Sequence, residues 1–555
     1  MATIIADNII SPLGYSTQAN FQAIKAGKSA LCHYQEAPGI PFPFTASLFS
    51  DGQKQEFRLD GYTTFESLAI TSIRKTLAEQ PIPLDERTCL IISSTKQDAE
   101  QMPDSPAHNI AHAIGIATTP IIVCNACISG VSALILGNRL IEMHQYDYVI
   151  VCGIDLQSPF IISGFQSLKA LSETECRPFD IERNGLNLGE AVATLILSRD
   201  NRADGWHIAG SAIRNDAFHI SSPSPKAEGC QMVIETVMEG EKTSQLAVIN
   251  AHGTATLYND QMEARGLIRT GLSNIPTNAL KGYYGHTMGA AGLLETILTL
   301  HSIDNKTIIG TRGFDELGVS GNIHIVKDNT PTTQTDFLKI ISGFGGCNAA
   351  IYLSKTPSQF PLQESKKLMT LHSIVITPQK VALDNEEIDI KGHKGGALLT
   401  HLYKTRIQNY PKFYKMDALA QLGFVATELL QQKERETKDV RDLGDRAIIF
   451  FNQSSSVHAD KVFLSSISDP ENFFPSPAAF VYTLPNIVNG EIAIRNGYHG
   501  ETAFYLLPYK DDELMHMITQ ATMLDKYNKS IITGWLEYVA EDEFCAELSI
   551  MSQKK

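Results

Sequence analysis

The sequence lacks the features that mark membrane, secreted and nucleic-acid-binding proteins. No apolar run approaches the ~18 residues of a membrane-spanning helix, and the opening MATIIADNIISPLG lacks the basic segment and continuous apolar core of a signal peptide. Lysine and arginine form no basic run, and the formal net charge is −15. We therefore expect no membrane span and no nucleic-acid partner, although a local basic patch for an acidic partner remains compatible with this charge.

Cysteine is scarce, with nine residues scattered over a chain of 555. This low and odd number fits free thiols in a reducing compartment, so we expect a cytoplasmic protein. Hydrophobic residues make up 43% of the chain, and the mean hydropathy is −0.08. Such a chain can bury large cores, and at roughly 100–200 residues per domain it divides into two to four folding units.

Strand and helix signals alternate along the first part of the chain. Residues 89–92, 120–123 and 148–152 are short apolar runs, the last closed by a glycine, and helical periodicity covers residues 62–77 and 130–143. Buried strands rich in Val and Ile and separated by helices indicate a parallel sheet covered on both faces.

The same alternation resumes after Arg202 and ends in a polar segment. Residues 246–250 and 337–341 are predicted strands, and residues 290–300 form a predicted helix. Residues 354–367, SKTPSQFPLQESKK, are polar and contain two prolines, so we interpret them as a linker. The chain that follows is long enough for a further domain.

The last block resembles the first in the order of its elements. Its helical stretch, 417–429, corresponds to 65–77, and its strands follow with an offset that drifts from roughly 351 to 382. This indicates a worn internal repeat, although any α/β domain shows a similar alternation. The paired strands are 447–451 with 89–92, 503–507 with 120–123, and 529–534 with 148–153.

Cys127 is the first candidate for chemistry. It lies just after a predicted strand, in the segment CNACISG, where a helix begins. The helix dipole and the backbone N–H groups there favour the thiolate, which is the nucleophilic form. A buried structural cysteine is one alternative. The spacing from Cys124 also permits a redox pair or half of a zinc site, although zinc needs further ligands.

Two histidines follow in segments rich in small residues. His252, in NAHGTAT, stands at the end of a predicted strand, where ligands meet parallel sheets. His286, in GHTMGAAG, is flanked by Lys281 and Glu295, and the glycines allow the backbone to approach a bound group closely. The alternative for His252 is a core histidine whose hydrogen bonds are satisfied within the protein. The alternative for the His286 segment is a turn needed only for helix–sheet packing.

A glycine-rich loop completes the set. Residues 342–348, SGFGGCN, present backbone N–H groups that can form an anion-binding nest. Cys127, His252, Lys281, His286 and this loop occur in a fixed order, each after a predicted strand. We interpret the combination as the equipment for acyl transfer onto a thiol followed by carbanion chemistry.

These motifs resemble those of the β-ketoacyl-acyl-carrier-protein synthase family, in its elongating Cys-His-His form. The matching segments include the Cys127 elbow, HGTxT from residue 252, GFGGxNA from residue 343, and RPFDxxRNG from residue 177. The resemblance covers roughly residues 1–355. It implies an α/β protein with the thiolase fold, in which two βαβαβαββ halves, about 1–200 and 205–355, stack as five αβαβα layers.

The resemblance also implies roles for the site residues. Cys127 would accept an acyl chain from a carrier-protein thioester, and the backbone N–H groups of Cys127 and Phe344 would form the oxyanion hole. His252 and His286 would donate hydrogen bonds to the malonyl thioester carbonyl and stabilise the enolate left by loss of CO₂. Phe344 would gate the acyl pocket.

Lys281 would pair with Glu295 and hold the charge and geometry of the site. The family implies no metal and no bound cofactor, because phosphopantetheine arrives on the acyl carrier protein. It also implies a dimer, either a homodimer or a pseudo-dimer with a ketosynthase-like domain. Asn125, Ala255 and Cys347 depart from the family pattern, which puts the starter and chain-length preference in doubt more than the activity.

We expect a linker at 356–368 and a degenerate ketosynthase N-terminal-like domain at 369–555. Pro508 or Tyr509 stands where its nucleophile would be, and its only cysteine, Cys545, lies well past that point. It resembles an inactive chain-length-factor partner. We expect it to pack on a synthase domain, in cis or in trans, and to help shape the acyl tunnel.

The sequence thus predicts a 3-oxoacyl-[acyl-carrier-protein] synthase that condenses an acyl-enzyme thioester with malonyl-carrier protein, in polyene, aryl-polyene, flexirubin-type or related lipid synthesis. A housekeeping fatty-acid elongating synthase is an alternative, but it needs no inactive appendage. A non-catalytic chain-length factor or scaffold is another, which the intact Cys127, His252 and His286 argue against. A thiolase or hydrolase would lack the histidine pair.

Overall fold

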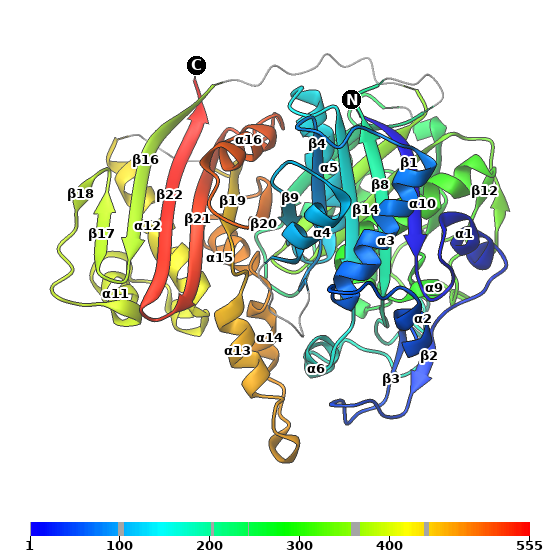
Figure 1. Ribbon diagram of the computed structural model, residues 1–555, viewed down its shortest axis with the longest axis horizontal. Helices are drawn as coiled ribbons and strands as arrows, with labels where there is room; N and C mark the ends of the chain where they lie inside the picture. The colour runs from blue at the N-terminus through cyan, green and yellow to red at the C-terminus, as the bar shows by residue number, and fades with distance from the viewer. Residues whose placement is uncertain are drawn as a thin grey trace.

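Three sheets that share the same order of five strands form the framework of the protein (Figure 1), and β17 (Lys380–Leu383) and β18 (Glu386–Glu387) extend the third of them. The computed structural model describes residues 2–97, 105–200, 205–241, 243–356, 367–437 and 443–554. We call residues 2–200 the first unit, 205–356 the second unit and 367–554 the third unit. In each, four of these strands run in one direction, and the strand second from one edge runs antiparallel to them.

The order of these five strands is the same in the three units when they are written from the edge next to the antiparallel strand. In the first unit it is β1 (Thr3–Ile10), β8 (Ala191–Ser198), β6 (Tyr148–Asp155), β4 (Thr88–Ser93) and β5 (Ile121–Val123). In the second it is β9 (Trp206–Asn215), β15 (Cys347–Ser354), β14 (Asp336–Gly343), β10 (Leu246–Asn250) and β11 (Thr277–Asn278). In the third it is β16 (Leu368–Thr377), β22 (Glu543–Gln553), β21 (Ser530–Ala540), β19 (Arg446–Asn452) and β20 (Thr502–Leu506).

The first two units stack as five layers. Helices α3 (Thr64–Glu79) and α4 (Pro106–Ile114) cover the outer face of the first sheet, and α7 (Glu228–Val237) and α8 (Leu257–Arg269) cover that of the second. Between the sheets lie α5 (Ser129–Glu142) and α10 (Ala291–Asp304). This arrangement confirms the predicted five-layer α/β architecture.

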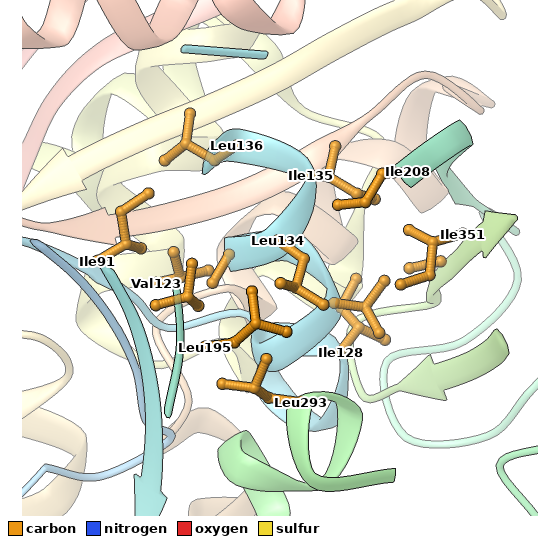
Figure 2. Close-up of a cluster of buried hydrophobic side chains, with 14 of the residues drawn as sticks. Ile91, Val123, Ile128, Leu134, Ile135, Leu136, Leu195, Ile208, Leu293 and Ile351 are labelled. Atoms are coloured by element: carbon orange, nitrogen blue, oxygen red, sulfur yellow. The ribbon is translucent and has the colours of Figure 1, made fainter. Parts of the chain in front are cut away.

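Helix α5 is the buried centre of the molecule. Its residues from Ser129 to Ile141 are all buried, and Figure 2 shows Leu134, Ile135 and Leu136 among apolar side chains from both sheets and from α10. A helix that is apolar all round requires cover on every side. Sandwiching α5 between the sheets therefore fixes its N-terminus, and with it the residues just before it.

Local signals account for the element boundaries. Thr63 and Glu66 form a capping box that starts α3, and the Asp417 carboxylate accepts the N–H groups of Leu419 and Ala420 to start α12 (Ala418–Thr437). The strand predicted to close at Gly153 instead runs on to Asp155. Gly153 is needed inside this strand because a Cβ there would lie 3.0 Å from Ala290 Cα.

The third unit packs in cis against the other two (Figure 1). Strand β20 pairs antiparallel with β5, with Tyr505 opposite Val123, so the first and third sheets are continuous. Helix α16 (Asp512–Thr522) lies against α5. The predicted linker lies largely outside the described residues.

A buried ionic cluster joins all three units. The Arg139 guanidinium on α5 contacts Glu501 at 2.8 Å, and the Arg214 guanidinium on β9 contacts Asp525 at 2.6 Å. Such a buried set tolerates little displacement, because separating one partner strands an unpaired charge.

The other elements complete the units. They are α1 (Thr17–Lys25), β2 (Cys32–Tyr34), β3 (Phe44–Ser47), α2 (Asp51–Glu56), η1 (Ala126–Ile128), α6 (Pro159–Ser167), β7 (Leu188–Gly189), α9 (Lys281–Tyr284), η3 (Met288–Ala290), β12 (Thr307–Ile308), β13 (Thr330–Pro331), β17 (Lys380–Leu383), β18 (Glu386–Glu387), α11 (Gly395–Leu402), α13 (Val457–Ser465), α14 (Pro477–Tyr482) and α15 (Ile487–Asn496). None of the helices in the described ranges has the length and apolar character needed to cross a membrane.

Candidate active site

Cys127 sits on a sharp turn between β5 and α5. Ala126 just before it has a φ of +47°, in the left-handed region that costs energy for any residue with a Cβ. The Ser129 hydroxyl holds this turn by accepting the Asn125 N–H at 2.8 Å and donating to the Ala126 carbonyl at 2.6 Å. The strained turn places the thiol at the start of the central helix, as the sequence predicts.

The thiol of Cys127 is under opposing influences. Burial raises the pKa of its thiol to about 12, and this outweighs the lowering by the Lys281 ammonium and by the backbone N–H groups of Cys127 and Phe344. The backbone N–H groups act in the expected direction, but a fully enclosed thiol loses more hydration than they return. The two N–H groups nevertheless converge on the sulfur.

His252 and His286 stand beside the thiol. Their ring centroids are 5.1 Å apart with the planes at 81°, and ligand atoms of Cys127, His252 and His286 all lie within 4.8 Å of one another. Burial, followed by the nearby ammonium groups, lowers the pKa of both rings well below the usual value. Both imidazoles are therefore neutral, so each offers one N–H donor and one acceptor.

The backbone around the two histidines is firmly held. The Glu263 carboxylate accepts the His252 N–H at 2.6 Å and the Gly253 N–H at 2.8 Å. The His286 N–H donates to the Asn187 carbonyl at 2.7 Å. Neither ring nitrogen of His286 has a protein partner, although the residue is 1% exposed. An unpaired buried imidazole is costly unless a ligand satisfies it, which favours a bound carbonyl.

Lys281 and Glu295 form the predicted ion pair, with 2.6 Å between Lys281 Nζ and Glu295 Oε1. A second lysine shares this carboxylate, because Lys339 Nζ lies 2.5 Å from Glu295 Oε2. Burial works against the charge of Glu295, but the two ammonium groups outweigh it and lower its pKa. Burial lowers the pKa of Lys339 to about 8. Lys281 also donates to the His252 carbonyl at 2.7 Å, so the ionic cluster positions the histidine.

Three buried residues of the site were missed by the sequence reasoning. Lys339 on β14 is the only charged side chain within the otherwise apolar run FLKII, which is a usable signal. Glu263 lies on α8, about two turns past the histidine motif. Asp155 ends β6 and accepts the Gly289 N–H at 2.6 Å, which holds the loop of His286. No local pattern distinguishes these two carboxylates from surface ones.

The RPFDxxRNG segment supports the site from outside. The Phe179 N–H donates to Asp260 at 2.7 Å, and Asp260 also accepts the Ala255 N–H beyond His252. Asp180 accepts the backbone N–H groups of Asp315 and Glu316. This motif thus braces the loop that carries the first histidine.

A cavity of about 370 Å³ leads to Cys127, with His252, His286 and Phe344 in its walls. A second cavity of only about 10 Å³ lies on the other side of the thiol, and Phe165 and Phe344 border both cavities. The two rings lie with centroids 6.2 Å apart at 24°. Phe344 therefore borders both the larger cavity and the smaller pocket.

Cys127, His252 and His286 also form a set that can hold a soft metal ion. Cys124 does not belong to it, because its thiol donates to the Thr95 carbonyl at 3.4 Å. The metal and redox interpretations of the CxxC spacing thus find no support in the geometry. All nine cysteines are free thiols in the structure.

Comparisons with known proteins agree with this geometry. The beta-ketoacyl synthase N-terminal domain model matches residues 79–203, and the C-terminal domain model matches residues 206–315. The 3-oxoacyl-[acyl-carrier-protein] synthase 2 of Coxiella burnetii is 29% identical over 252 residues, which are 42% of this chain and 61% of that protein. A tetracenomycin polyketide synthase ketoacyl synthase alpha subunit of Streptomyces glaucescens is 29% identical over 274 residues, 46% of this chain and 64% of that protein.

Solved structures share the fold over the whole chain. A PfaC keto synthase–chain length factor structure matches 100% of this chain and 78% of its own, with a TM-score of 0.74 and 13% identity. The ishigamide ketosynthase/chain length factor matches 64% of this chain and 99% of its own, with a TM-score of 0.58 and 21% identity.

Residues 79–203 and 206–315 thus match the two domains of beta-ketoacyl synthases, and the chain has the thiolase fold of the ketosynthase structures that it resembles. It spans only about three fifths of the length of the Coxiella burnetii and Streptomyces glaucescens relatives that it matches.

Proposed function

We propose that the protein is a 3-oxoacyl-[acyl-carrier-protein] synthase that joins an acyl chain on Cys127 to a malonyl unit on a carrier protein. The observation that carries this proposal is the meeting of one thiol and two neutral imidazoles at the end of a cavity of about 370 Å³. A thiol with one histidine serves many acyl transfers, but a second neutral imidazole provides a further donor for an enolate.

In the first half-reaction, the Cys127 sulfur attacks the acyl thioester of the carrier protein. The bond from carbonyl carbon to the carrier sulfur breaks, and the Cys127 proton passes to that leaving thiolate. The backbone N–H groups of Cys127 and Phe344, which converge on the sulfur, are placed to stabilise the tetrahedral oxyanion. A protonated resting thiol suits this exchange, because one thiol proton is given up and one carrier thiol is formed.

In the second half-reaction, His252 and His286 donate hydrogen bonds to the malonyl thioester carbonyl. The bond to the carboxylate breaks, CO₂ leaves, and the electron pair remains as an enolate held by these two donors. The enolate carbon attacks the acyl-Cys127 carbonyl, forming the new C–C bond and releasing the Cys127 thiolate, which takes up a proton. Neutral rings fit this role because donation requires an N–H but no net charge.

We also propose that residues 369–555 form an inactive, chain-length-factor-like domain joined by the 356–368 linker. Phe480, Thr483 and Leu484 of the third unit line the small pocket beside Cys127. Behind them, Lys96 of the first unit pairs with Asp460 of the third at 2.6 Å. The third unit would thus replace the second subunit of a homodimer and close the acyl pocket in cis. It would thereby set the chain length in the synthesis of a polyene, aryl-polyene, flexirubin-type or related lipid.

Reconstitution with malonyl-carrier protein, phosphopantetheine attached, and a panel of acyl starters tests the proposal by intact-protein mass. We expect an acyl adduct on Cys127 and 3-oxoacyl products on the carrier. A Cys127→Gln variant should release CO₂ without condensing, because the two histidines remain. A Cys127→Ala variant that still elongates would overturn the mechanism.

A further inference from the structure

The third unit makes direct contact with the loop that carries Phe344. The hairpin turn between β14 and β15 consists of Phe344, Gly345 and Gly346, and the two glycines have φ values of +88° and +74°. The start of α15 lies against this turn. A Cβ built on Gly490 would be 2.7 Å from the Gly345 carbonyl oxygen and 2.8 Å from Gly345 Cα, so the helix backbone touches the loop backbone.

Asn486 is the residue that joins the two. It stands at the N-cap position of α15, where an asparagine side chain ordinarily accepts an N–H of its own helix, yet it makes no such bond. Its Nδ2 instead donates to the Phe344 carbonyl at 2.9 Å. Asn486 is 2% exposed, so this hydrogen bond is shielded from water. The Asn486 side chain therefore bonds the second unit instead of capping its own helix.

The other hydrogen bonds of this turn anchor its two glycines, among them that from the Asp216 N–H to the Gly346 carbonyl at 2.8 Å. The Gly345 N–H donates to the Ile220 carbonyl at 2.7 Å, and Asn215 Nδ2 donates to the Gly345 carbonyl at 2.7 Å. Both anchor residue 345. Phe344 itself is fixed on its carbonyl by Asn486 and by the Cys347 thiol at 3.0 Å. The position of its ring between the two cavities therefore depends on a donor from the third unit.

We propose that Asn486 is a positioning residue that holds Phe344 between the entrance cavity and the pocket beside Cys127, so that the third unit controls admission of acyl chains. The proposal extends the proposed function, but its first test needs no condensing activity. Releasing the carbonyl of Phe344 frees the turn to swing away from Phe165, and the two cavities then join.

The test compares two alkylating reagents on the full chain, iodoacetamide and N-octyl iodoacetamide, with attachment to Cys127 mapped by peptide mass. Iodoacetamide needs only the entrance cavity, whereas the octyl chain needs the pocket beyond Phe344. In Asn486→Leu, which keeps the volume but loses the donor, we expect the ratio of octyl to small-reagent rates to rise about fivefold, the effect of one typical hydrogen bond. Asn486→Ala should change it in the same direction.

Gly490→Ala provides a second route to the same loop, because its methyl group must displace Gly345. It should also raise the ratio. Asn496→Ala is the matched control, since Asn496 lies on the same helix but bonds Glu428 instead. It should leave the ratio unchanged. A general loosening of the fold would raise both alkylation rates together and lower the melting temperature.

An unchanged rate ratio in Asn486→Leu and Gly490→Ala would overturn the gating role. This outcome is separate from a failure of the proposed function, which would appear as absent condensation in the unaltered protein while the alkylation ratios still responded. Transfer of long acyl chains to Cys127 should rise in step with the ratio, whereas CO₂ release by the Cys127→Gln protein should stay unchanged by Asn486→Leu.

Discussion

The first and third units share a strand order but differ just after the edge strands β5 and β20. In each unit, one set of residues paired across the three neighbouring parallel strands includes a glycine, which is Gly153 in β6 and Gly534 in β21. Cys127 lies four residues after the β5 residue of this set, and Pro508 lies four residues after the β20 residue of the corresponding set. One unit thus has a thiol on a strained turn, and the other has a residue with neither a thiol nor an N–H.

This difference indicates which parts of the fold serve assembly and which serve chemistry. The third unit retains β20, which extends the first sheet, and α16, which covers α5. It carries Pro508 instead of a thiol at the equivalent position, and it provides surface that covers the first unit. Its helices instead supply Phe480 and Asn486 to the neighbouring site. A repeated unit can therefore serve packing without a nucleophile of its own.

The largest expected effect comes from exchanging residues at the two equivalent positions. Cys127→Ala removes the acyl acceptor, and we expect condensation to fall at least about a thousandfold. Pro508→Ala should leave the rate within about twofold, because nothing in the proposed chemistry uses this residue. Both rates are measured as 3-oxoacyl product on the carrier protein by intact mass. Loss of activity in Pro508→Ala with an unchanged melting temperature would contradict an inactive third unit.

A second comparison sets two buried ion pairs against each other. Glu295→Gln leaves Lys281 and Lys339 without their carboxylate, and Glu434→Gln leaves Arg446 without the carboxylate it contacts at 2.8 Å. Each should cost about 3–5 kcal/mol in the free energy of unfolding, because a buried charge loses its partner. Denaturant titration measures this loss.

Only Glu295→Gln should also change the chemistry, since Lys281 holds the His252 carbonyl. We expect its CO₂ release to fall at temperatures where the protein stays folded, whereas Glu434→Gln should retain it. Equal loss of CO₂ release in both folded variants would show that the Glu295 cluster acts only through stability.

The response to acid should separate the histidines of the site from those of the third unit. His252 and His286 have pKa values lowered well below normal by burial. Below about pH 6.5, the unfolded chain binds protons at these rings and the folded chain does not. Stability is therefore lost as pH falls, by up to about 1.4 kcal/mol per pH unit for each ring.

His286→Gln should make the free energy of unfolding fall less steeply between about pH 6.5 and pH 5, by about one proton. The control is His458→Gln in the third unit, where the ring is only half-buried and burial lowers the pKa to a lesser degree. It should change the slope less. Identical slopes for wild type and His286→Gln would mean that His286 is protonated in the folded protein.

The sequence predicts features that depend on residues close together in the chain better than it predicts contacts between residues far apart in the chain. Apolar runs located β4, β5 and β10 because buried strands are rich in Val and Ile wherever they pair. The motifs located Cys127 and both histidines because each needs particular small neighbours beside it. Local pattern marks Lys339 as an unusual charge within a strand, but it could not identify its partner Glu295, which lies 44 residues away.

Contacts between units were still harder to predict. Asn486 has the residue type and the position of an ordinary helix cap, and only the packed structure shows that its side chain faces Phe344. The β5–β20 pairing likewise depends on two edges meeting after each sheet has formed. The sequence left cis and trans packing open for this reason, and the assembled chain shows the cis arrangement.

The smallest expected effect concerns the wall that the third unit contributes to the acyl pocket. Phe480 lies so close to Gly164 that a Cβ there would be 2.1 Å from its ring, and it borders the cavity of about 10 Å³ beside Cys127. Phe480→Ala removes this wall, and we expect longer acyl chains among the products, with short starters used at rates within about threefold of wild type because the thiol and histidines are untouched. Phe474→Ala, at a side chain that is 83% exposed, serves as the control and should leave the product lengths unchanged. Mass spectrometry of carrier-bound products gives both distributions, and the same distribution in Phe480→Ala and wild type would place the end of the acyl chain away from the third unit.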